Sequence, residues 1–462
     1  MRATLLQLRH GYRIRLGTVH FTSAAPMKAL ILAESCNPEW ESVPLVGWSH
    51  YHAVADVVDT HLVTRSRNLP ELLRAGLVEG RDFTVIDTEA LFEPMAKFVE
   101  LIAGPNKGWA MLQALSLPSY FAFEYIAWQR FGDRIRAGEF DVVHRITPVS
   151  PAVPSPMAAK CKRAGVPFVL GPINGGLPWP KEFPDLRKRE REFISGLRGL
   201  YRKVPSYRST RDSADAILVG SSGVLADLEQ KWHSKAIYMP ENAIEPDRFA
   251  NPPMRQPQDY MGRKLRGFCL GRMVPFKGMD MVLDAAAPLL RDGRMTLDIA
   301  GFGPERSGLE AQAEALGVTA HVRFLGKIPH PDIAALMLKA DVLPYPSVRE
   351  FGGGVVLEAM AMGVVPIAIA YGGPAELITP ETAFALQLAP RADIVAALRA
   401  RLEDLAANPG QLAVMSQAAI ARVEQYFTWP ARALQTLEVY RWVTGQRPDK
   451  PDFQQQPLFK AD

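Results

Sequence analysis

The sequence predicts an α/β protein with two domains, each built on a parallel sheet. Short runs of β-branched and aliphatic residues alternate with amphipathic stretches of helix length along the chain, which is typical of parallel α/β sheets. The 462 residues exceed the ~250–300 that a single hydrophobic core serves. With 48% apolar and 22% charged residues, the chain has the composition of an ordinary globular protein.

The predicted strands divide into two sets. In the first half they are 29–33, 53–61, 141–146, 168–170, 216–219 and 236–239, and in the second half 267–270, 296–300, 322–325, 342–343 and 365–370. The Pro-rich, polar segment 251–266 between the sets predicts a linker. We therefore expect a tail (1–26), a first domain (27–250), a second domain (267–424) and a C-terminal helix and tail (425–462).

Charge and cysteine content exclude several classes of protein. The formal net charge is +4, which is too small for a dedicated nucleic-acid binder. Cys36, Cys161 and Cys269 are too far apart for a disulfide framework or a zinc site, and they indicate a reducing cytoplasm. The sequence contains no uninterrupted apolar run of about 18 residues, so it does not predict a membrane span. The first 26 residues lack the apolar block of a secretory signal and are interpreted as a tail.

Parallel sheets bind ligands at the carboxyl ends of their strands, so the chemistry is expected in strand-to-helix loops, within a cleft between the domains. The first such loop is Gly271-Arg-Met-Val-Pro-Phe-Lys-Gly278. Arg272 and Lys277 suit a diphosphate, which Arg binds bidentately and Lys as a point charge. A solvated basic loop is the alternative.

Gly301-Phe-Gly303 follows the next predicted strand and resembles half of a dinucleotide fingerprint. The third glycine of that fingerprint is replaced by Arg306, which disfavours a Rossmann dehydrogenase. A simple tight turn at a strand end is the alternative.

The most informative stretch is Glu350-Phe-Gly-Gly-Gly-Val355-Val-Leu-Glu358. Gly352, Gly353 and Gly354, leading into an apolar helix, leave N–H groups open at a helix N-terminus, where a phosphate is stabilised. Glu350 and Glu358 are then placed to accept hydrogen bonds from sugar or ribose hydroxyls. The alternative is a surface charge and a first-turn helix acid. A further glycine pair and carboxylate, Tyr371-Gly-Gly-Pro-Ala-Glu376, ends the strand 365–370.

These motifs together resemble the retaining GT-B glycosyltransferases of the group 1 family (family 4 of the sugar-nucleotide transferases). The similarity covers roughly residues 236–380, and its matching features are Gly271-Arg…Lys277-Gly, Leu297-Asp-Ile-Ala-Gly-Phe-Gly-Pro, Val322-Arg-Phe-Leu-Gly, Ala340-Asp-Val-Leu-Pro-Tyr-Pro-Ser, the Glu350/Glu358 pair, Gly372-Gly-Pro-Ala-Glu and Asn242-Ala-Ile-Glu-Pro-Asp-Arg-Phe. The resemblance implies two Rossmann-like domains facing each other across a cleft, with the last helix crossing back to the first domain.

The resemblance also implies roles for individual residues. Arg272 and Lys277 would bind the diphosphate of a nucleotide sugar, UDP- or GDP-linked, and Glu358 its ribose. Glu350 would contact the transferred sugar as a catalytic residue. Gly301 and Gly303 would line the donor site, and the amides of Gly352, Gly353, Gly354 and Val355 would lie over the phosphate. The implied reaction retains the anomeric configuration and uses no metal or other cofactor, which agrees with the lack of an Asp-x-Asp motif.

The first half matches the family less well. Its first strand is followed by Glu34-Ser-Cys-Asn in place of the usual glycine pair. Asp141-Val-Val-His-Arg-Ile-Thr-Pro lacks the family's second histidine, which is replaced by Ile146. His144 points to the same side of the strand and is a candidate catalytic substitute, or else a hydrogen-bonded strand histidine. Asn174, Gly175 and Gly176 are predicted on the acceptor side.

The acceptor hydroxyl is expected to belong to a glycan, a lipid-linked acceptor or a small molecule. Residues 181–211 carry ten basic and four acidic residues among apolar ones, which indicates either peripheral contact with an anionic inner membrane face or a solvated helix face. Two other functions stay open. One is a synthase or phosphorylase of small glycosides on the same fold, and the other is a sugar-nucleotide-binding protein without catalysis.

Overall fold

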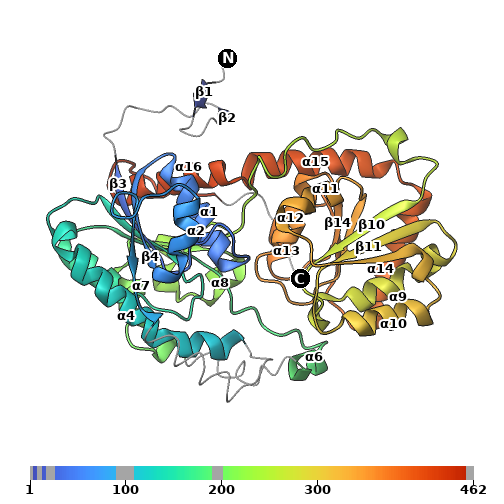
Figure 1. The fold of residues 1–462 in the computed structure, drawn as a ribbon, viewed down its shortest axis with the longest axis horizontal. Coiled ribbons are helices and arrows are strands. Elements are labelled where there is room, and N and C mark those ends of the chain that lie inside the picture. The colour runs from blue at the N-terminus through green and yellow to red at the C-terminus, as the bar shows by residue number, and fades with distance from the viewer. Residues whose placement is uncertain (1–3, 8–12, 17–26, 90–108, 190–200, 454–462) are drawn as a thin grey trace. The chain divides into compact units, whose positions relative to one another are not determined.

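The computed structural model describes residues 4–7, 13–16, 27–89, 109–189 and 201–453 (Figure 1). Two compact units account for the chain. The first unit consists of 1–176, 190–241 and 429–454, and the second of 177–189, 242–428 and 455–462. The chain therefore passes from one unit to the other more than once. Each unit is described by itself.

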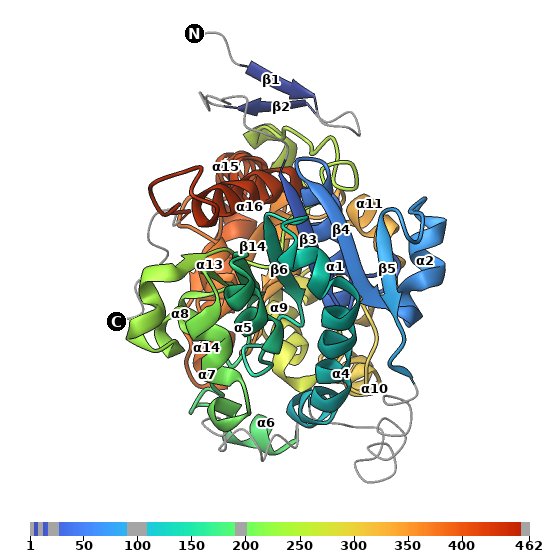
Figure 2. The ribbon, with the colours of Figure 1, turned by 90° about the vertical axis from the view of Figure 1, so that its left-hand side faces the viewer.

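The first unit is a seven-stranded parallel sheet with the order β5-β4-β3-β6-β7-β8-β9 (Figure 2). Its strands are β3 (Lys28–Ala33), β4 (Asp59–Arg65), β5 (Phe83–Ile86), β6 (Val142–Thr147), β7 (Phe168–Ile173), β8 (Ala216–Val219) and β9 (Ala236–Tyr238). Its helices are α1 (Val43–Ala55), α2 (Leu69–Arg74), α4 (Trp109–Arg136), α5 (Pro156–Ala164), α7 (Tyr207–Ser213), α8 (Ser222–Asp227) and α16 (Trp429–Val443), with the 3-10 helices η1 (Ser66–Asn68) and η3 (Gln230–Lys235).

Two hydrophobic cores lie on the two faces of this sheet. One joins alternate strand residues to α4, α5 and α7, and the other joins the intervening strand residues to α1 and α16. Alternation along β6 divides its side chains between the cores: Val143 belongs to the first, and Val142 and Ile146 to the second. The last helix, α16, packs against α1 inside this unit.

Two short strands are described near the N-terminus. β1 (Thr4–Gln7) and β2 (Arg13–Leu16) pair antiparallel, with Thr4 opposite Leu16 (Figure 2). The sequence predicts only a tail for residues 1–26, so this hairpin is an addition to that expectation.

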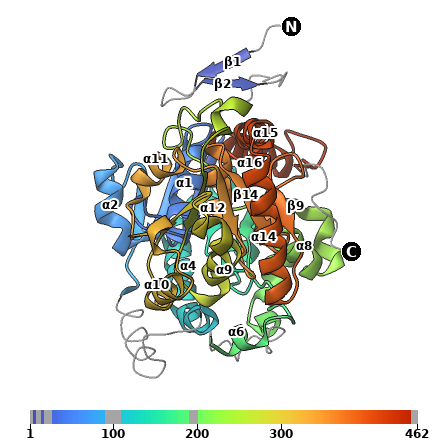
Figure 3. The ribbon, with the colours of Figure 1, turned by 90° about the vertical axis from the view of Figure 1, so that its right-hand side faces the viewer.

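The second unit is a six-stranded parallel sheet with the order β12-β11-β10-β13-β14-β15, of which β14 is labelled in Figure 3. Its strands are β10 (Leu265–Leu270), β11 (Met295–Ala300), β12 (Val322–Gly326), β13 (Val342–Tyr345), β14 (Val365–Ile369) and β15 (Phe384–Leu386). Its helices are α6 (Pro184–Arg189), α9 (Met279–Arg291), α10 (Arg306–Ala315), α11 (Ile333–Met337), α12 (Gly354–Ala361), α13 (Gly373–Leu377), α14 (Arg391–Ala407) and α15 (Gln411–Tyr426), with the 3-10 helices η4 (Pro257–Tyr260), η5 (Pro275–Lys277), η6 (Thr319–His321) and η7 (His330–Asp332).

Helices cover both faces of this sheet as well. α9, α10 and α14 pack on one face around a core that includes Val282 and Leu297, whereas α11, α12 and α15 pack on the other around Leu343 and Met360. Among the described residues, no helix is both long and apolar enough to cross a membrane.

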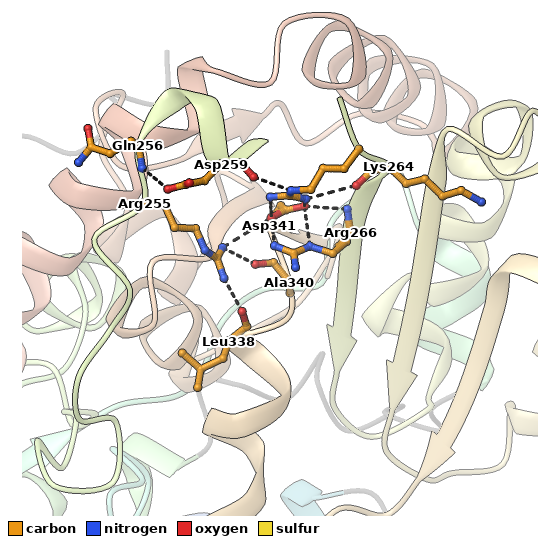
Figure 4. Close-up of polar contacts among 9 residues, drawn as sticks. Arg255, Gln256, Asp259, Lys264, Arg266, Leu338, Ala340 and Asp341 are labelled. Atoms are coloured by element: carbon orange, nitrogen blue, oxygen red, sulfur yellow. Dashed lines mark hydrogen bonds and ion pairs between the residues drawn. The ribbon is translucent and has the colours of Figure 1, made fainter. Parts of the chain in front are cut away.

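The segment 251–266, predicted as a linker, belongs to the second unit. Tyr260 is buried in its core, and Leu265 and Arg266 already form β10. Three arginines of this segment lie around the buried carboxylate of Asp341, which directly precedes β13 (Figure 4). The sequence shows the prolines and the basic residues, but it does not show that three of the arginines share one acid that lies next to a distant strand.

The Asp341 cluster is defined by short contacts. The Asp341 carboxylate accepts hydrogen bonds from Arg263 at 2.6 and 2.8 Å and from Arg266 at 2.7 and 3.1 Å, and Arg255 Nη1 lies 3.6 Å from it. Arg255 also donates to the carbonyl oxygens of Ala340 (2.7 Å) and Leu338 (Figure 4). The cluster therefore ties residues 255–266 to the sheet of the second unit.

Most predicted strands coincide with observed ones to within two residues at their starts. The exception is 53–61, where α1 continues to Ala55 and β4 begins only at Asp59. The short strands β5 and β15 were not predicted.

Candidate functional site

The strand order of the second unit reverses direction between β10 and β13. In open parallel sheets, ligands bind beside the carboxyl ends of the strands at such a switch point. The loop after β10 carries Arg272 and Lys277, and the loop after β13 carries Glu350. The fold thus brings together the two loops that the sequence singles out.

Lys277, Tyr345 and Glu350 form a compact polar cluster. The Lys277 ammonium donates a hydrogen bond to Tyr345 Oη at 2.7 Å and another to Glu350 Oε2. Tyr345 Oη donates to the same carboxylate oxygen at 2.6 Å. The sequence singles out Lys277 and Glu350 separately, whereas their direct contact and the part of Tyr345 emerge only from the fold.

The environment of Glu350 favours its charged form. Burial alone would raise the pKa of this carboxyl, but the nearby Lys277 ammonium, together with hydrogen bonds from Tyr345 and the Gly353 N–H, lowers it. For Tyr345, burial and the adjacent carboxylate raise the pKa well above its usual value. At neutral pH, Glu350 is therefore a carboxylate and Tyr345 a neutral phenol.

Glu358 lies within α12, on the helix that starts at the glycines. Its Oε1 is 2.9 Å from Nε2 of His330 in η7, and its carboxylate acts electrostatically on Arg248. The side chain is only 15% exposed. His330 and Arg248 are therefore neighbours of Glu358 that the sequence does not assign to the site.

Gly301 and Gly303 allow the loops after β10 and β11 to run side by side. A Cβ on Gly301 would lie 1.9 Å from the Gly271 oxygen, and one on Gly303 would lie 2.3 Å from the Met273 oxygen. Both glycines have positive φ, at 133° and 156°. Because any side chain would push the two loops apart, these glycines have a steric role whether or not they line a ligand site.

The N-terminus of α12 is built from Gly352, Gly353 and Gly354. Gly353 is the N-cap residue at φ 65°, and its N–H donates a hydrogen bond to the Glu350 carboxylate. Gly354 and Val355 are the first two helical residues, so their N–H groups have no acceptor inside the helix. These two amides are the ones open to an anion.

Arg272 differs from Lys277 in its surroundings. Its side chain is exposed and makes no hydrogen bond or ion pair with the part of the chain that the structure describes. It is thus available to a ligand, and no hydrogen bond or ion pair from the described residues holds it in one position.

In the first unit, Asn174 follows β7 and is held by one acidic and one hydroxyl side chain. Its amide nitrogen donates to both carboxylate oxygens of Glu241 at 2.8 Å, and its amide oxygen accepts from Ser221 Oγ at 3.0 Å and from the Gly175 N–H at 2.8 Å. Gly176 is exposed and has φ 73°. Glu241 is a residue of this cluster that the sequence analysis does not single out.

His144 lies inside the first unit, where it is fully buried. Its Nδ1 is 2.6 Å from Tyr440 Oη, and its Nε2 is 2.6 Å from the Gly171 oxygen. Burial lowers its pKa to about 4, so the ring is neutral. These contacts are those of a hydrogen-bonded strand histidine, which is one of the two alternatives that the sequence leaves open for His144. The other alternative, a catalytic role toward a substrate, stays a prediction.

Two further predictions concern charge and metal. In the described residues, no group of three or more His, Cys, Asp or Glu side chains is arranged to hold a metal ion. The basic stretch 181–211 is only partly described, because 190–200 lie outside the described residues. Membrane contact through that stretch remains a prediction.

A family model for glycosyl transferases group 1 matches residues 255–422. The chain carries a group 1 glycosyltransferase domain. D-inositol 3-phosphate glycosyltransferase of Corynebacterium aurimucosum is 31% identical over 255 residues, which cover 51% of this chain and 55% of that protein. GDP-mannose-dependent alpha-(1-6)-phosphatidylinositol monomannoside mannosyltransferase of Mycolicibacterium smegmatis is 33% identical over 219 residues, covering 44% and 55%. The chain thus spans about half the length of these relatives.

Solved structures resemble the chain beyond its glycosyltransferase domain. HepE of Anabaena, crystallised with UDP, has a TM-score of 0.57 and 18% identity, and the match covers 89% of this chain and 99% of HepE. Sucrose-phosphate synthase of Thermosynechococcus elongatus has a TM-score of 0.57 and 18% identity, covering 91% and 100%. With its two parallel sheets, the chain therefore has the GT-B fold of these proteins.

Proposed function

We propose that this protein transfers a sugar from a nucleotide sugar to an acceptor hydroxyl, with retention of the anomeric configuration and without a metal ion. The observation that carries the proposal is the convergence of Lys277, Glu350 and Tyr345 at the switch point of the second sheet, beside the open amides of α12. The match to the group 1 family over the same residues supports it.

The donor's diphosphate fits the cationic part of this site. An ammonium has three N–H donors, and Lys277 uses two of them on Tyr345 and Glu350, which leaves the third for a phosphate oxygen. The amides of Gly354 and Val355 add the partial positive charge of a helix N-terminus. As the sugar–phosphate bond breaks, these groups and Arg272 stabilise the charge that develops on the leaving diphosphate.

Two carboxylates would bind the donor's hydroxyl groups. Glu350 is held in its charged form close to Lys277 and would accept hydrogen bonds from the transferred sugar. Glu358, beside His330, would accept them from the ribose. Charged acceptors form roughly twice as strong hydrogen bonds as neutral ones, so these contacts would fix the orientation of the donor.

The nature of the donor and acceptor is proposed from the relatives. HepE was crystallised with UDP and with UDP-glucose, and the mycobacterial relative is named as GDP-mannose-dependent. A UDP- or GDP-linked sugar is therefore proposed as the donor. Relatives named for inositol phosphate and phosphatidylinositol mannoside acceptors support a polyol, glycan or lipid-linked acceptor.

The test is donor turnover by the purified chain. We expect slow hydrolysis of one UDP- or GDP-linked sugar, at a rate that EDTA leaves unchanged. With an acceptor added, we expect an α-linked transfer product from an α-linked donor by NMR. A β-linked product would contradict retention, and loss of activity with EDTA would contradict metal independence. Tight donor binding with no hydrolysis or transfer would favour a sugar-nucleotide-binding protein.

A synthase of small glycosides or glucans is the second candidate. Glycogen synthase of Mycobacterium tuberculosis is 35% identical over 188 residues, covering 39% of this chain and 44% of that protein, and sucrose-phosphate synthase shares the fold. Transfer to a soluble sugar, a sugar phosphate or an α-glucan primer, and not to a lipid-linked acceptor, would favour this function.

A further inference from the structure

A short piece of chain from the first half of the sequence belongs to the second unit. It is 177–189, which directly follows Asn174, Gly175 and Gly176. Phe183 is 7% exposed and lies in the same core as α9 and β11, and Leu186 packs against that core. The segment is therefore anchored to the domain that carries the candidate donor site.

Residues 177–179 of this segment contact three loops of the second unit. Tyr371 Oη donates a hydrogen bond to the Pro178 oxygen at 2.7 Å. The Trp179 ring meets the Phe276 ring edge-on, with 6.3 Å between centroids. A Cβ on Gly372 would lie 2.6 Å from Leu177 Cδ2, so Leu177 packs directly on that glycine.

The third loop is held through Arg349. Its guanidinium carbon lies 4.6 Å from the centroid of the Trp179 ring and 4.9 Å from that of Phe351, which places the cation against two aromatic rings. Its Nε donates to the Leu177 oxygen at 3.3 Å. Both residues that flank Glu350 in sequence are thus part of the same contact.

The three contacted residues share one property. Phe276, Arg349 and Tyr371 are the immediate neighbours of Lys277, Glu350 and Gly372. The backbone oxygen of Glu350 also accepts a hydrogen bond from the Gly373 N–H at 2.9 Å, which ties the loop of Arg349 to the loop of Tyr371. Residues 177–179 therefore touch the loops of the candidate site without supplying any of its charged groups.

We propose that Trp179 and Arg349 are positioning residues for the donor site. The Trp179 ring holds the Arg349 side chain, and this contact fixes the loop that presents Glu350 to the transferred sugar. The role in donor binding rests on the proposed function, whereas the ordering of the loop does not. Through this contact, donor affinity would depend on residues 177–179, which directly follow the predicted acceptor-side residues Asn174, Gly175 and Gly176.

The first test is hydrogen exchange in the protein without ligand. Trp179→Ala is compared with Trp128→Ala, because Trp128 is also half-buried and also lies against cations, those of Arg136 and Lys160, but belongs to the first unit. We expect amides of 346–354 to exchange about 2- to 30-fold faster in the Trp179 variant only, since cation–π contacts contribute ~0.5–2 kcal/mol. Unchanged exchange in these amides would overturn the proposal.

The second test separates positioning from a purely structural role. With UDP-glucose or GDP-mannose, whichever the wild type hydrolyses, Trp179→Ala is expected to raise the donor KM about tenfold with a smaller change in kcat, and Trp179→Phe is expected to restore most of the affinity. Arg349→Gln should give the same rise in KM. If Trp179→Ala and Arg349→Gln both lower the thermal stability but leave the donor KM unchanged, the positioning role is refuted.

The two tests also keep the proposals apart. Wild-type protein that hydrolyses neither donor would count against the proposed function, while faster exchange of 346–354 in Trp179→Ala would still support the ordering of that loop. If Trp179→Ala does not fold, Arg349→Gln carries the same comparison, because it removes the cation and leaves residues 177–179 intact.

Discussion

Replacing Asp341 by alanine is predicted to destabilise the second unit strongly. Asp341 is fully buried and is the shared partner of Arg255, Arg263 and Arg266 (Figure 4). Removing one member of a buried charge cluster leaves the others without compensation, which typically costs about 3–5 kcal/mol. Arg263 and Arg266 are 27% and 35% exposed and can reach water, so the lower part of that range is expected.

The expected loss of unfolding free energy can be measured as a shift of the melting temperature. For a domain of this size, about 1 kcal/mol shifts the midpoint by about 2–4 °C, so Asp341→Ala should lower it by roughly 6–12 °C. The acid dependence has a defined sign. Burial would raise the pKa of Asp341, but hydrogen bonds from Arg263 and Arg266 lower it, so its contribution is present above the unfolded pKa of about 3.9 and is lost as pH falls through the folded pKa.

Calorimetry of the purified protein is the assay, and Asp298→Ala is the matched control. Asp298 forms a bidentate pair with Arg323 in the same unit, but that arginine is 68% exposed, and such surface pairs contribute at most about 1 kcal/mol. A shift below 2 °C for Asp341→Ala, or equal shifts for the two variants, would refute the reasoning.

Three other variants test the site and its supports. Glu358→Gln should weaken UDP or GDP binding about 10- to 100-fold in calorimetric titrations, since hydrogen bonds to charged groups contribute ~1.5–3 kcal/mol; unchanged binding would remove its ribose role. Gly301→Ala, whose Cβ would lie 1.9 Å from the Gly271 oxygen, should destabilise by about 2 kcal/mol or more in urea unfolding, whereas Gly308→Ala, with open space around it, should not. Burial lowers the pKa of His144 to about 4, so the unfolded state binds a proton that the folded state does not as pH falls from 6.5 to 4. Over that range the free energy of unfolding should fall by up to about 3 kcal/mol. His144→Gln should flatten this pH dependence, and an unaltered pH profile in the variant would count against the prediction.

The sequence predicts the parallel sheets because their strands are buried on both faces and read as continuous apolar runs. β8 and β14 are examples in which every residue is buried. β5 and β15 were missed because they lie at sheet edges, are short and are partly exposed, so their apolar signal is weak. The prediction of a strand at 53–61 failed because only Asp56 separates the apolar residues at the end of α1 from Val57 and Val58 before β4.

For the site, loop motifs predict which residues matter but not how they contact one another. Lys277 and Glu350 are 73 residues apart, and only the order of β10 and β13 in the sheet makes them neighbours. Tyr345 lies inside the matching stretch 340–347 but carried no assigned role, and His330 lies in none of the motifs. The contact of Trp179 with Arg349 joins residues far apart in sequence. The Pro-Trp-Pro sequence at 178–180 marks a stiff aromatic segment, but its partners follow from the fold alone.

The central claim is that the loops at the switch point of the second sheet bind the diphosphate of a nucleotide sugar. The most direct measurement is the thermal stability of wild type, Lys277→Ala and Arg272→Ala against UDP-, GDP- and ADP-linked sugars. A donor at ~100 times its dissociation constant should add about 2.7 kcal/mol to the stability of the wild type. We predict this gain with one nucleotide class only, and its loss in both variants. Because Arg272 is exposed and makes no ion pair with the described part of the chain, its replacement should leave the unliganded stability unchanged. The full gain in both variants, or none in the wild type with any donor, would contradict the account.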